Sequence, residues 1–329
     1  MERITMAHGS GGKSGAELMA RVFGKHFSNE VLDKMEDAAV LDINGRIAFS
    51  TDTFVVTPTV FKGGDIGKLC ICGTVNDLLM MGAVPKYLTC GFVLEEGLDV
   101  ELLDKIVASM AETAKKAGVI IVAGDTKVVE GHGGLFINTT GIGIIPEDRD
   151  VSAANCKTGD KIILSGTLGD HHACILSARM NVENNIKSDC AVLAPICNAL
   201  FDNGITVRTM RDVTRGGLGT IINEIARTSG VHIDLEEESI PVNDDVSGFC
   251  GIMGLDPLYM GNEGKMIIIV PGDQAEKALS LVRGTEEGKN AAIIGTVADA
   301  EKATVTMTTR LGGSRVVDVL YGEGLPRIC

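Results

Sequence analysis

The chain ends in Pro326-Arg327-Ile328-Cys329, which places a thiol on the last residue, beside the terminal carboxylate. The preceding Gly322-Glu323-Gly324-Leu325 holds two glycines and no apolar repeat, so it predicts a flexible strap that Pro326 stiffens near its end. A thiolate on such an arm could enter a pocket, react there and swing out to a partner. A terminal cysteine can also be without function, so this interpretation depends on what the rest of the chain offers.

Carboxylates suited to a hard cation recur in the first half of the chain. The stretch 38–50 predicts a β-hairpin around the turn signal Asn44-Gly45. Asp37 would lie at the start of the first strand, and Asp52, beside Thr53, just beyond the end of the second. Carboxylates at strand ends are well placed for a magnesium ion that bridges phosphates, although each of them alone is also an ordinary turn residue.

Two further polar sites interrupt apolar stretches. Residues 65–84 predict a buried helix because they are nearly all apolar, and Asn76 and Asp77 are the strongly polar residues in its middle. A buried carboxylate needs a partner, which could be another side chain or a magnesium ion. The strand expected at 119–123 runs into Gly124-Asp125-Thr126-Lys127. Three aspartates on separate elements form a group that binding of a metal ion and phosphates would explain together.

The second half adds an anion site and a lone carboxylate. The glycine-rich turn 211–219 carries two arginines and opens a predicted helix, whose free N–H groups favour an anion. Glu263 lies in the turn Gly261-Asn262-Glu263-Gly264-Lys265, where a carboxylate suits a reactive centre more than packing. The pair His171-His172 follows Asp170 at another helix start. This pair could be catalytic, but helix capping and exposure to solvent is the preferred interpretation.

A glycine-rich segment at the N-terminus imitates a phosphate loop. The stretch 8–15 contains Gly12-Lys13-Ser14, but a Walker loop needs a glycine five residues before Gly12, and Ala7 stands there. The remaining interpretations are a mobile flap over nucleotide phosphates or a simple flexible arm.

The composition excludes several classes of function. The net charge of −14 argues against nucleic acid or an anionic membrane surface as the main partner. No apolar stretch is long enough to span a bilayer or to act as a signal peptide. Nine cysteines without a paired Cys-x-x-Cys fit thiols kept reduced, and argue against zinc or a disulfide framework. We therefore expect a cytoplasmic protein.

The elements that must position these residues alternate between strands and helices. Strands at 87–94 and 135–145 flank an amphipathic helix at 99–117, and residues 146–150 form the best linker candidate. A length of 329 residues with 45% hydrophobic residues suits two cores. We predict an α/β chain with an N-terminal domain over 1–150, a C-terminal domain over 151–309 and a flexible tail over 310–329.

From end to end the motifs resemble those of the HypE family of hydrogenase maturation factors, carbamoyl dehydratases of the PurM (aminoimidazole ribotide synthetase-like) ATP-binding superfamily. The aspartate motifs belong to the whole superfamily, whereas PRIC and GDTKVV are much more specific to HypE. Departures are small: His172 stands where the family usually has glycine, and Lys13 occupies a variable position. The matching stretches are HGSGG at 8–12, FSTDT at 49–53, ICGTVNDLLMMGA at 71–83, VAGDTKVV at 122–129, RDVTRGGL at 211–218, GLDPLYMGNEGK at 254–265 and PRIC at 326–329.

The resemblance implies a two-domain PurM-like fold, a homodimer formed across the N-terminal β-sheet, and ATP and Mg²⁺ as cofactors. In that family the carbamoyltransferase HypF loads a carbamoyl group onto the terminal sulfur, here Cys329. ATP then drives dehydration of this group to a thiocyanate, and the HypC–HypD complex takes the cyanide for the iron of nickel–iron hydrogenase.

The resemblance also implies roles for individual residues. Glu263 would be the base, with Lys127 as its electrostatic or proton-handling partner. The residues expected to bind magnesium are Asp52, Asp77, Asp125 and Asp212, and those expected around the nucleotide also include Asp37, Thr53, Asn76 and Thr126.

Two other functions stay open. Another PurM-like enzyme, such as a selenophosphate synthetase or a thiamine-phosphate kinase, would act on a free small molecule and have an inert tail. A non-enzymatic carrier would only ferry a group on its terminal thiol. The PRIC terminus argues against the first, and the aspartates argue against the second.

Overall fold

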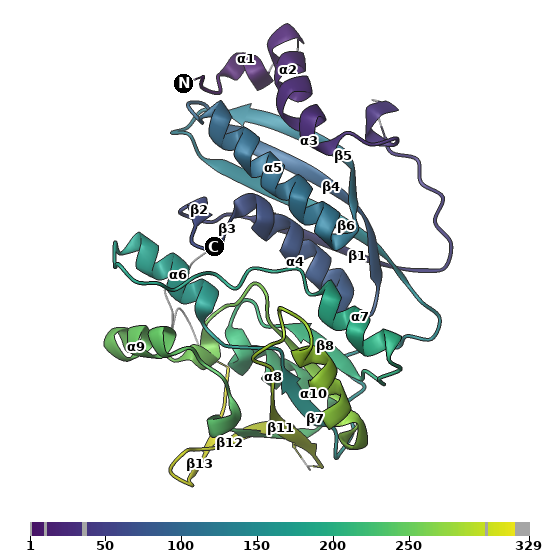
Figure 1. The fold of residues 1–329 in the computed structure, drawn as a ribbon, viewed down its shortest axis with the longest axis vertical. Helices are drawn as coiled ribbons and strands as arrows, with labels where there is room; N and C mark the ends of the chain where they lie inside the picture. Colours follow the sequence, from purple (N-terminus) through teal and green to yellow (C-terminus); the bar gives the residue numbers. More distant parts are fainter. Residues whose placement is uncertain (1, 10–11, 35–37, 300–301, 320–329) are drawn as a thin grey trace.

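The computed structural model describes residues 2–9, 12–34, 38–299 and 302–319 (Figure 1). Asp37, the expected strap and Cys329 lie outside these described residues. Two sheets with helices on their faces follow each other along the chain, one in an N-terminal half (residues 2–145) and one in a C-terminal half (residues 157–319). This arrangement confirms the predicted α/β class. Among the described helices, none has the length and apolar character needed to cross a membrane.

The sheet of the N-terminal half has four strands with helices on one face (Figure 1). Helix α4 begins where Asp65 caps it by accepting a hydrogen bond from the Lys68 N–H at 2.9 Å, and helix α5 ends at Gly118, whose φ of +70° suits glycine. The strands, in spatial order, are β1 (Arg46–Phe54), β6 (Leu135–Ile145), β4 (Val84–Glu95) and β5 (Ile120–Val129), and the helices are α4 (Ile66–Met80) and α5 (Val100–Ala117).

The expected hairpin over 38–50 is wrong. Residues 38–45 form no strand, and β1 instead pairs along its whole length with β6, from Arg46 opposite Ile145 to Phe54 opposite Ile137. Val40 is 84% exposed, so a strand at 38–42 would bury little apolar surface, whereas β6 has one face covered by α4. Asp52 and Asp125 therefore lie inside strands and not at strand ends.

The C-terminal half is built on a seven-stranded sheet, in which strand β10, between β7 and the edge strand β8, is buried along its whole length. Its strands, in spatial order, are β13 (Ser314–Val316), β12 (Thr304–Thr308), β9 (His232–Glu236), β11 (Ala292–Ala298), β7 (Lys161–Leu164), β10 (Met266–Val270) and β8 (Thr209–Asp212). Its helices are α6 (Asp170–Arg179), α7 (Ala194–Asp202), α8 (Gly217–Ser229), α9 (Asp244–Met253) and α10 (Ala275–Arg283), with 3₁₀ turns η3 (Glu237–Ser239), η4 (Pro257–Tyr259) and η5 (Gly272–Gln274). Strand β13 lies beyond residue 309, where the sequence placed the start of the tail.

Short elements complete the N-terminal half. They are α1 (Met6–Gly9), α2 (Gly12–Leu18), a π-helix η1 (Met19–Gly24), α3 (Lys25–Phe27), η2 (Leu32–Lys34), and the two-residue strands β2 (Val60–Phe61) and β3 (Gly64–Asp65). Residues 12–27 are thus helical in three consecutive pieces, and the apolar side chains of Leu18, Val22 and Phe23 are buried.

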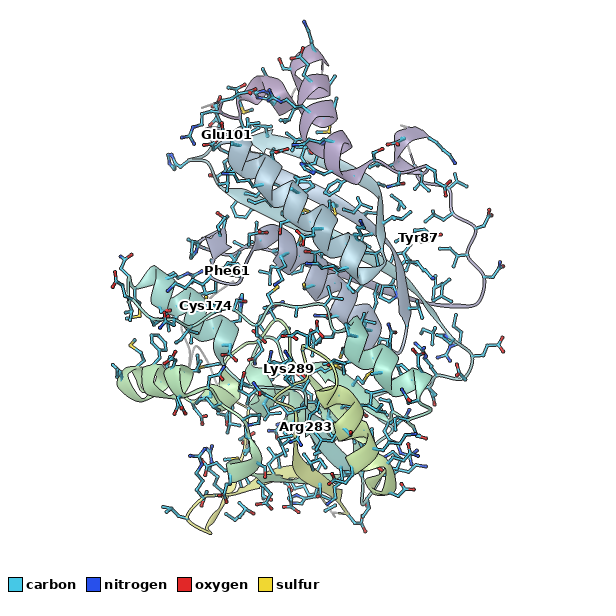
Figure 2. The ribbon with its side chains drawn as sticks, viewed as in Figure 1. Phe61, Tyr87, Glu101, Cys174, Arg283 and Lys289 are labelled. Atoms are coloured by element: carbon cyan, nitrogen blue, oxygen red, sulfur yellow. The ribbon has the colours of Figure 1, made fainter. Side chains whose placement is uncertain are left out.

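Helix α4 holds the two halves together, because it lies between the N-terminal sheet and the elements β8 and α7 of the other half. One continuous apolar core contains residues of both halves. A second contact joins β2 to α6, where Figure 2 labels Phe61 and Cys174. The Phe61 ring meets the His171 ring edge-on with 5.5 Å between centroids, and the Cys174 thiol lies 3.4 Å from the Lys62 carbonyl oxygen.

Candidate active site

Three aspartates meet where α4 faces the end of β1 and the end of β8. Asp52 lies on the face of β1 that α4 covers, and its carboxyl group is hydrogen-bonded to that of Asp77 on α4. The Ser50 hydroxyl, two residues earlier on the same face, donates to Asp77 Oδ2 at 2.5 Å. Asp212 ends β8, which packs against α4, so three elements bring three carboxyl groups together.

The carboxyl groups of this cluster destabilise one another's charge. Burial above all, together with the charges of Asp212 and Asp52, raises the pKa of Asp77 to about 7, and the Ser50 hydrogen bond opposes this rise. Burial likewise raises the pKa of Asp212 to about 6, against the lowering effect of Arg211 and with a further contribution from Asp52. A cation at this position would remove the repulsion, so the charge arrangement favours binding of a positive ion.

The donor set fits magnesium held together with phosphates. Within the described residues, no group of three or more His, Cys, Asp or Glu side chains is arranged to hold a metal ion by itself. Magnesium bound with a nucleotide typically uses one or two carboxylates and completes its six oxygen ligands with phosphates and water. The three aspartates therefore suit a phosphate-bridging ion and do not form a cage built from protein alone.

Asp125 lies on the opposite face of the sheet. Asp125 pairs with Gly91 of β4, Gly91 pairs with Asn138 of β6, and Asn138 pairs with Thr53 of β1. Side chains along such a row share one face, and this face is the one that α4 and α5 leave open. The structure thus brings together Asp52, Asp77 and Asp212, but it separates Asp125 from them within one chain.

The open face of the sheet is polar around Asp125. Lys127 Nζ lies 2.8 Å from Asp125 Oδ2, and both side chains are 67% exposed. The hydrogen bond from Lys127 lowers the pKa of Asp125 despite slight burial. Asn138 Nδ2 donates to Thr53 Oγ1 at 3.1 Å. Thr126, the next residue, pairs with Phe92 and therefore lies on the opposite face, which α4 and α5 cover.

Asn76 already has structural partners. Its Nδ2 donates to the Ala191 carbonyl at 3.0 Å, and its Oδ1 accepts from the Leu193 N–H at 2.9 Å. These bonds fasten the loop before α7 to the middle of α4, next to Asp77. The buried amide that suggested nucleotide contact therefore joins the two halves.

The Glu263 turn is held by Asp189, a carboxylate that no sequence motif singled out. Asp189 accepts from the backbone N–H of Glu263 at 3.2 Å and of Gly264 at 3.1 Å, and Lys265 Nζ lies 3.5 Å from it. A Cβ on Gly264 would come within 1.9 Å of the Asp189 carbonyl oxygen, so only glycine fits. Asp189 is an isolated loop residue, and its role depends on contacts 74 residues away.

Glu263 faces both this loop and the aspartate cluster. Burial raises its pKa well above the usual range, and Cys190, Asp189, Asp212 and Asp52 add to the rise. The preceding Asn262 is fully buried and donates from Nδ2 to the Val213 carbonyl at 3.0 Å. Because Val213 follows Asp212, this bond fixes Glu263 relative to the cluster.

Two sequence expectations about polar groups need correction. His171 and His172 are buried, with 0% and 5% exposure, so the expected solvent exposure is wrong. The cap residue of α6 is Gly169 with no side-chain hydrogen bond, so the histidines do not cap the helix. In the glycine-rich turn 211–219, where the sequence predicted an anion site, the guanidinium of Arg211 is already paired with the Glu224 carboxylate at 2.9 Å.

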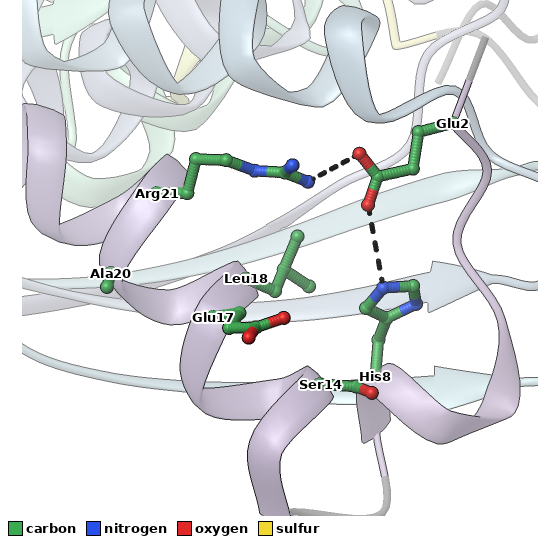
Figure 3. A pocket seen from close by; sticks show the side chains of 7 residues that line it. All are labelled: Glu2, His8, Ser14, Glu17, Leu18, Ala20 and Arg21. Atoms are coloured by element: carbon green, nitrogen blue, oxygen red, sulfur yellow. Dashed lines mark ion pairs between the residues drawn. The ribbon is translucent and has the colours of Figure 1, made fainter.

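A separate cavity of about 570 Å³ lies among residues of the N-terminal segment (Figure 3). Three of its polar side chains pair with each other, since Arg21 lies 2.7 Å from Glu2 Oε2 and His8 Nε2 lies 4.0 Å from Glu2 Oε1. Gly9 packs on β5, where a Cβ would come within 2.6 Å of Val128. This cavity is lined by residues 2–21 alone and contains none of the aspartates of the cluster.

Comparisons with known proteins decide between the superfamily members. The family model described as AIR synthase related protein, N-terminal domain, matches residues 35–145, and its C-terminal domain counterpart matches 157–308. The chain is 46% identical over 336 residues to the carbamoyl dehydratase HypE of Rhodobacter capsulatus, covering 100% of this chain and 98% of that protein. The chain belongs to the HypE family of carbamoyl dehydratases.

Solved HypE structures agree with this assignment. A crystal structure of HypE in complex with ATP superposes with a TM-score of 0.94 at 45% identity, covering 98% of this chain and 99% of that one. A HypE–HypF complex matches with a TM-score of 0.81 at 48% identity, over 92% and 99% of the two chains. The HypE resemblance carried by the sequence motifs is thereby confirmed, together with the two-part PurM-like fold.

Proposed function

We propose that this chain binds ATP and magnesium and dehydrates a carbamoyl group carried on the sulfur of its own Cys329 to a thiocyanate, from which cyanide is supplied to the iron of nickel–iron hydrogenase. The single observation that carries the proposal is full-length similarity to HypE, including a relative solved with ATP. The aspartate cluster with Glu263 beside it supplies residues suited to each step.

The overall conversion is a thiocarbamate plus ATP giving a thiocyanate, ADP and phosphate. Amide oxygen is a poor leaving group, so it first takes the γ-phosphoryl group, and the bond from this phosphoryl group to ADP breaks. The carbon–oxygen bond then breaks as phosphate leaves, and the two protons on nitrogen are lost. Magnesium held by Asp52, Asp77 and Asp212 would neutralise charge on the transferred phosphoryl group.

Glu263 is the proposed acceptor of the nitrogen protons. Its burial and its acidic neighbours raise its pKa, which makes its ionised form a stronger base. Asp189 and Asn262 fix the turn that carries it, so the carboxylate is held in place beside the cluster. The raised pKa is that of the protein without bound nucleotide, where the carboxylates repel one another.

Cys329 is the proposed carrier because the other thiols are poor candidates. The eight cysteines within the described residues are all buried. Burial raises the pKa of Cys90 and of Cys197 to about 12, which leaves almost no thiolate at neutral pH. Attachment to the chain would hold the carbamoyl group at high local concentration near the site.

A homodimer is proposed to cover the open face of the N-terminal sheet. This face exposes Phe49 by 62% and Ile47 by 49%, beside Val93 and Val129. Asp125, Lys127 and Thr53 lie on the same face, so we place them in the site of the second copy. Thr126 and Asp37 are proposed near the nucleotide by resemblance alone.

The remaining proposals concern partners and organisation. We propose HypF as the carbamoyl donor, because a relative was solved in complex with HypF, and the HypC–HypD complex as the acceptor. The division into domains over 1–150 and 151–309 is proposed to follow the two sheets, except that β13 extends the second sheet beyond residue 309. A cytoplasmic location remains an expectation from the reduced thiols.

The mass of the C-terminal peptide tests the proposal. Protein produced with its carbamoyl donor should gain one carbamoyl group at Cys329, then lose one water on addition of Mg-ATP, and Cys329→Ala should show neither change. Glu263→Gln should accept the group and bind ATP but stall before the loss of water. A carbamoyl group mapped to any other cysteine, or full conversion by Glu263→Gln at the wild-type rate, would refute the corresponding step.

A further inference from the structure

The last described residues are held against α8 and η4 by bonds that the proposed chemistry does not use. The Val317 N–H donates to the Val305 carbonyl at 3.0 Å, and Asn223 Nδ2 donates to the Val317 carbonyl at 2.9 Å. The Tyr259 hydroxyl donates to the Asp318 carbonyl at 2.8 Å. The preceding strand β13 is exposed along all three of its residues, whereas Val317 is only 1% exposed. Val317 and Asp318 are therefore the last firmly held point before residue 320.

We infer that Asn223 and Tyr259 are positioning residues that anchor the base of the C-terminal strap and so fix the point from which Cys329 reaches the active site. The inference rests on the proposed function, because it concerns delivery of the group on Cys329. What it adds to that function is a structural reason why the strap has a defined reach, namely its attachment at Asn223 and Tyr259.

Asn223 is difficult to explain by packing alone. It lies on the buried side of α8 and is 5% exposed, among Ile222, Ile225 and Ala226. A buried amide is costly unless it is hydrogen-bonded. One of its hydrogens is used within the helix, on the Gly219 carbonyl at 2.9 Å, and the other is used on the Val317 carbonyl. Its second bond is thus made to the base of the strap.

Tyr259 connects the anchor to the catalytic turn. A Cβ on Gly219 would come within 2.4 Å of the Tyr259 ring, so the glycine lets the ring lie against α8. Three residues after Tyr259, Asn262 is bound to Val213 through both its N–H, at 2.9 Å, and its side chain. Tyr259 and Glu263 therefore belong to one short segment, which is held by Tyr259 at one end and by Asn262 near the other.

The anchor fixes the point in the chain from which the distance to Cys329 is counted. Ten residues, 320–329, follow the last described residue, and their fully extended span is about 35 Å. Release of residues 317–319 would add three residues and about 10 Å of reach. A strap made too short to reach the site from the anchor should therefore work again once the anchor is released.

A deletion series within 321–325 tests this, one residue at a time, with Pro326–Cys329 kept. Each length is made with the intact anchor, with Asn223→Ala/Tyr259→Phe, and with the control Asn203→Ala, which changes an exposed asparagine just after the end of α7. Single-turnover dehydration of the carbamoylated protein is measured at each length. We expect the shortest fully active strap to be about three residues shorter in the double variant than in the other two series. The same critical length in all three series, or full activity at every length with the intact anchor, would overturn the inference.

Two further measurements separate anchoring from folding and from the chemistry itself. A chain ending at Val319 should dehydrate a synthetic S-carbamoyl peptide of residues 320–329 at equal rates with and without Asn223→Ala/Tyr259→Phe, and a slower rate in the double variant would mean damage to the site. Hydrogen exchange should show the Val317 amide protected in the wild type and exchanging in the double variant, and a rapidly exchanging wild-type amide would remove the anchor. Failure of the intact, carbamoylated wild type to lose water would refute the proposed function, whereas the exchange result tests the anchor without any activity.

Discussion

Replacing His171 by glutamine should change how the stability of the protein depends on pH. His171 is fully buried on α6, with Nδ1 2.8 Å from the Ser188 hydroxyl and Nε2 without a hydrogen-bond partner among the described residues. Burial lowers its pKa from the ordinary 6.5 to about 4, the charge of Asp189 opposes this shift, and His172 adds to it. The imidazole is therefore neutral in the folded protein at neutral pH.

The sign and size of the effect follow from proton linkage. Between pH 6.5 and pH 4, the unfolded chain binds a proton at this position that the folded chain lacks, so the free energy of unfolding decreases as the pH falls through this window. The loss is negligible at pH 8, about 2 kcal/mol at pH 5, and approaches about 3 kcal/mol below pH 4. Burial raises the pKa of Asp170, which acts in the opposite direction but is common to wild type and variant.

Urea unfolding followed by circular dichroism at about pH 8 and pH 5 measures this effect. His171→Gln will cost some stability at both values, because it alters the contacts with Ser188 and Phe61. Between pH 8 and pH 5, the free energy of unfolding of His171→Gln should nevertheless decrease by about 2 kcal/mol less than that of the wild type. The matched control His132→Gln, on an exposed loop, should keep the wild-type pH dependence. Equal pH dependence in His171→Gln and wild type would refute the assignment of a buried neutral imidazole.

Three further predictions concern the site. Asp77→Asn should weaken magnesium-dependent ATP binding by about tenfold or more, and calorimetry with unchanged affinity would contradict this. The variant should not lower the stability of the nucleotide-free protein, because one of three mutually repelling carboxylates is removed. Gly264→Ala should cost about 1–3 kcal/mol in urea unfolding and slow the single-turnover loss of water while ATP still binds, because its Cβ collides with Asp189; wild-type turnover would show that the turn adapts freely. Asp77→Asn and Lys127→Ala chains are mixed in equal amounts at an ATP concentration at which neither is active alone. The mixture should restore about a quarter of wild-type activity if Lys127 acts in the second copy, and no restoration would place Lys127 in the site of its own chain.

Local sequence determined those parts of the fold whose causes lie within a few residues. Helix α4 follows from an apolar run with Asp65 as its cap, and α5 follows from an amphipathic repeat between Asp99 and Gly118. Asp77 and Glu263 were identifiable because a carboxylate in an apolar helix, or in a glycine turn, needs a chemical reason to be there. The family followed from motifs at fixed spacing, above all the terminal PRIC and the GDTKVV segment.

Tertiary structure decided everything that depends on distant partners. The turn signal at Asn44-Gly45 predicted a local hairpin. Strand β1 instead pairs with β6, about 90 residues away, because more apolar surface is buried there, where α4 covers one face. That pairing fixes which alternate side chains of β1 face α4, and so unites Asp52 with Asp77. The same alternation places Asp125 on the other face, although its motif looks equivalent in sequence. Asp189 gained its role only when its loop met the Glu263 turn, because hydrogen bonds to backbone N–H groups leave no pattern in the sequence of the residue that accepts them.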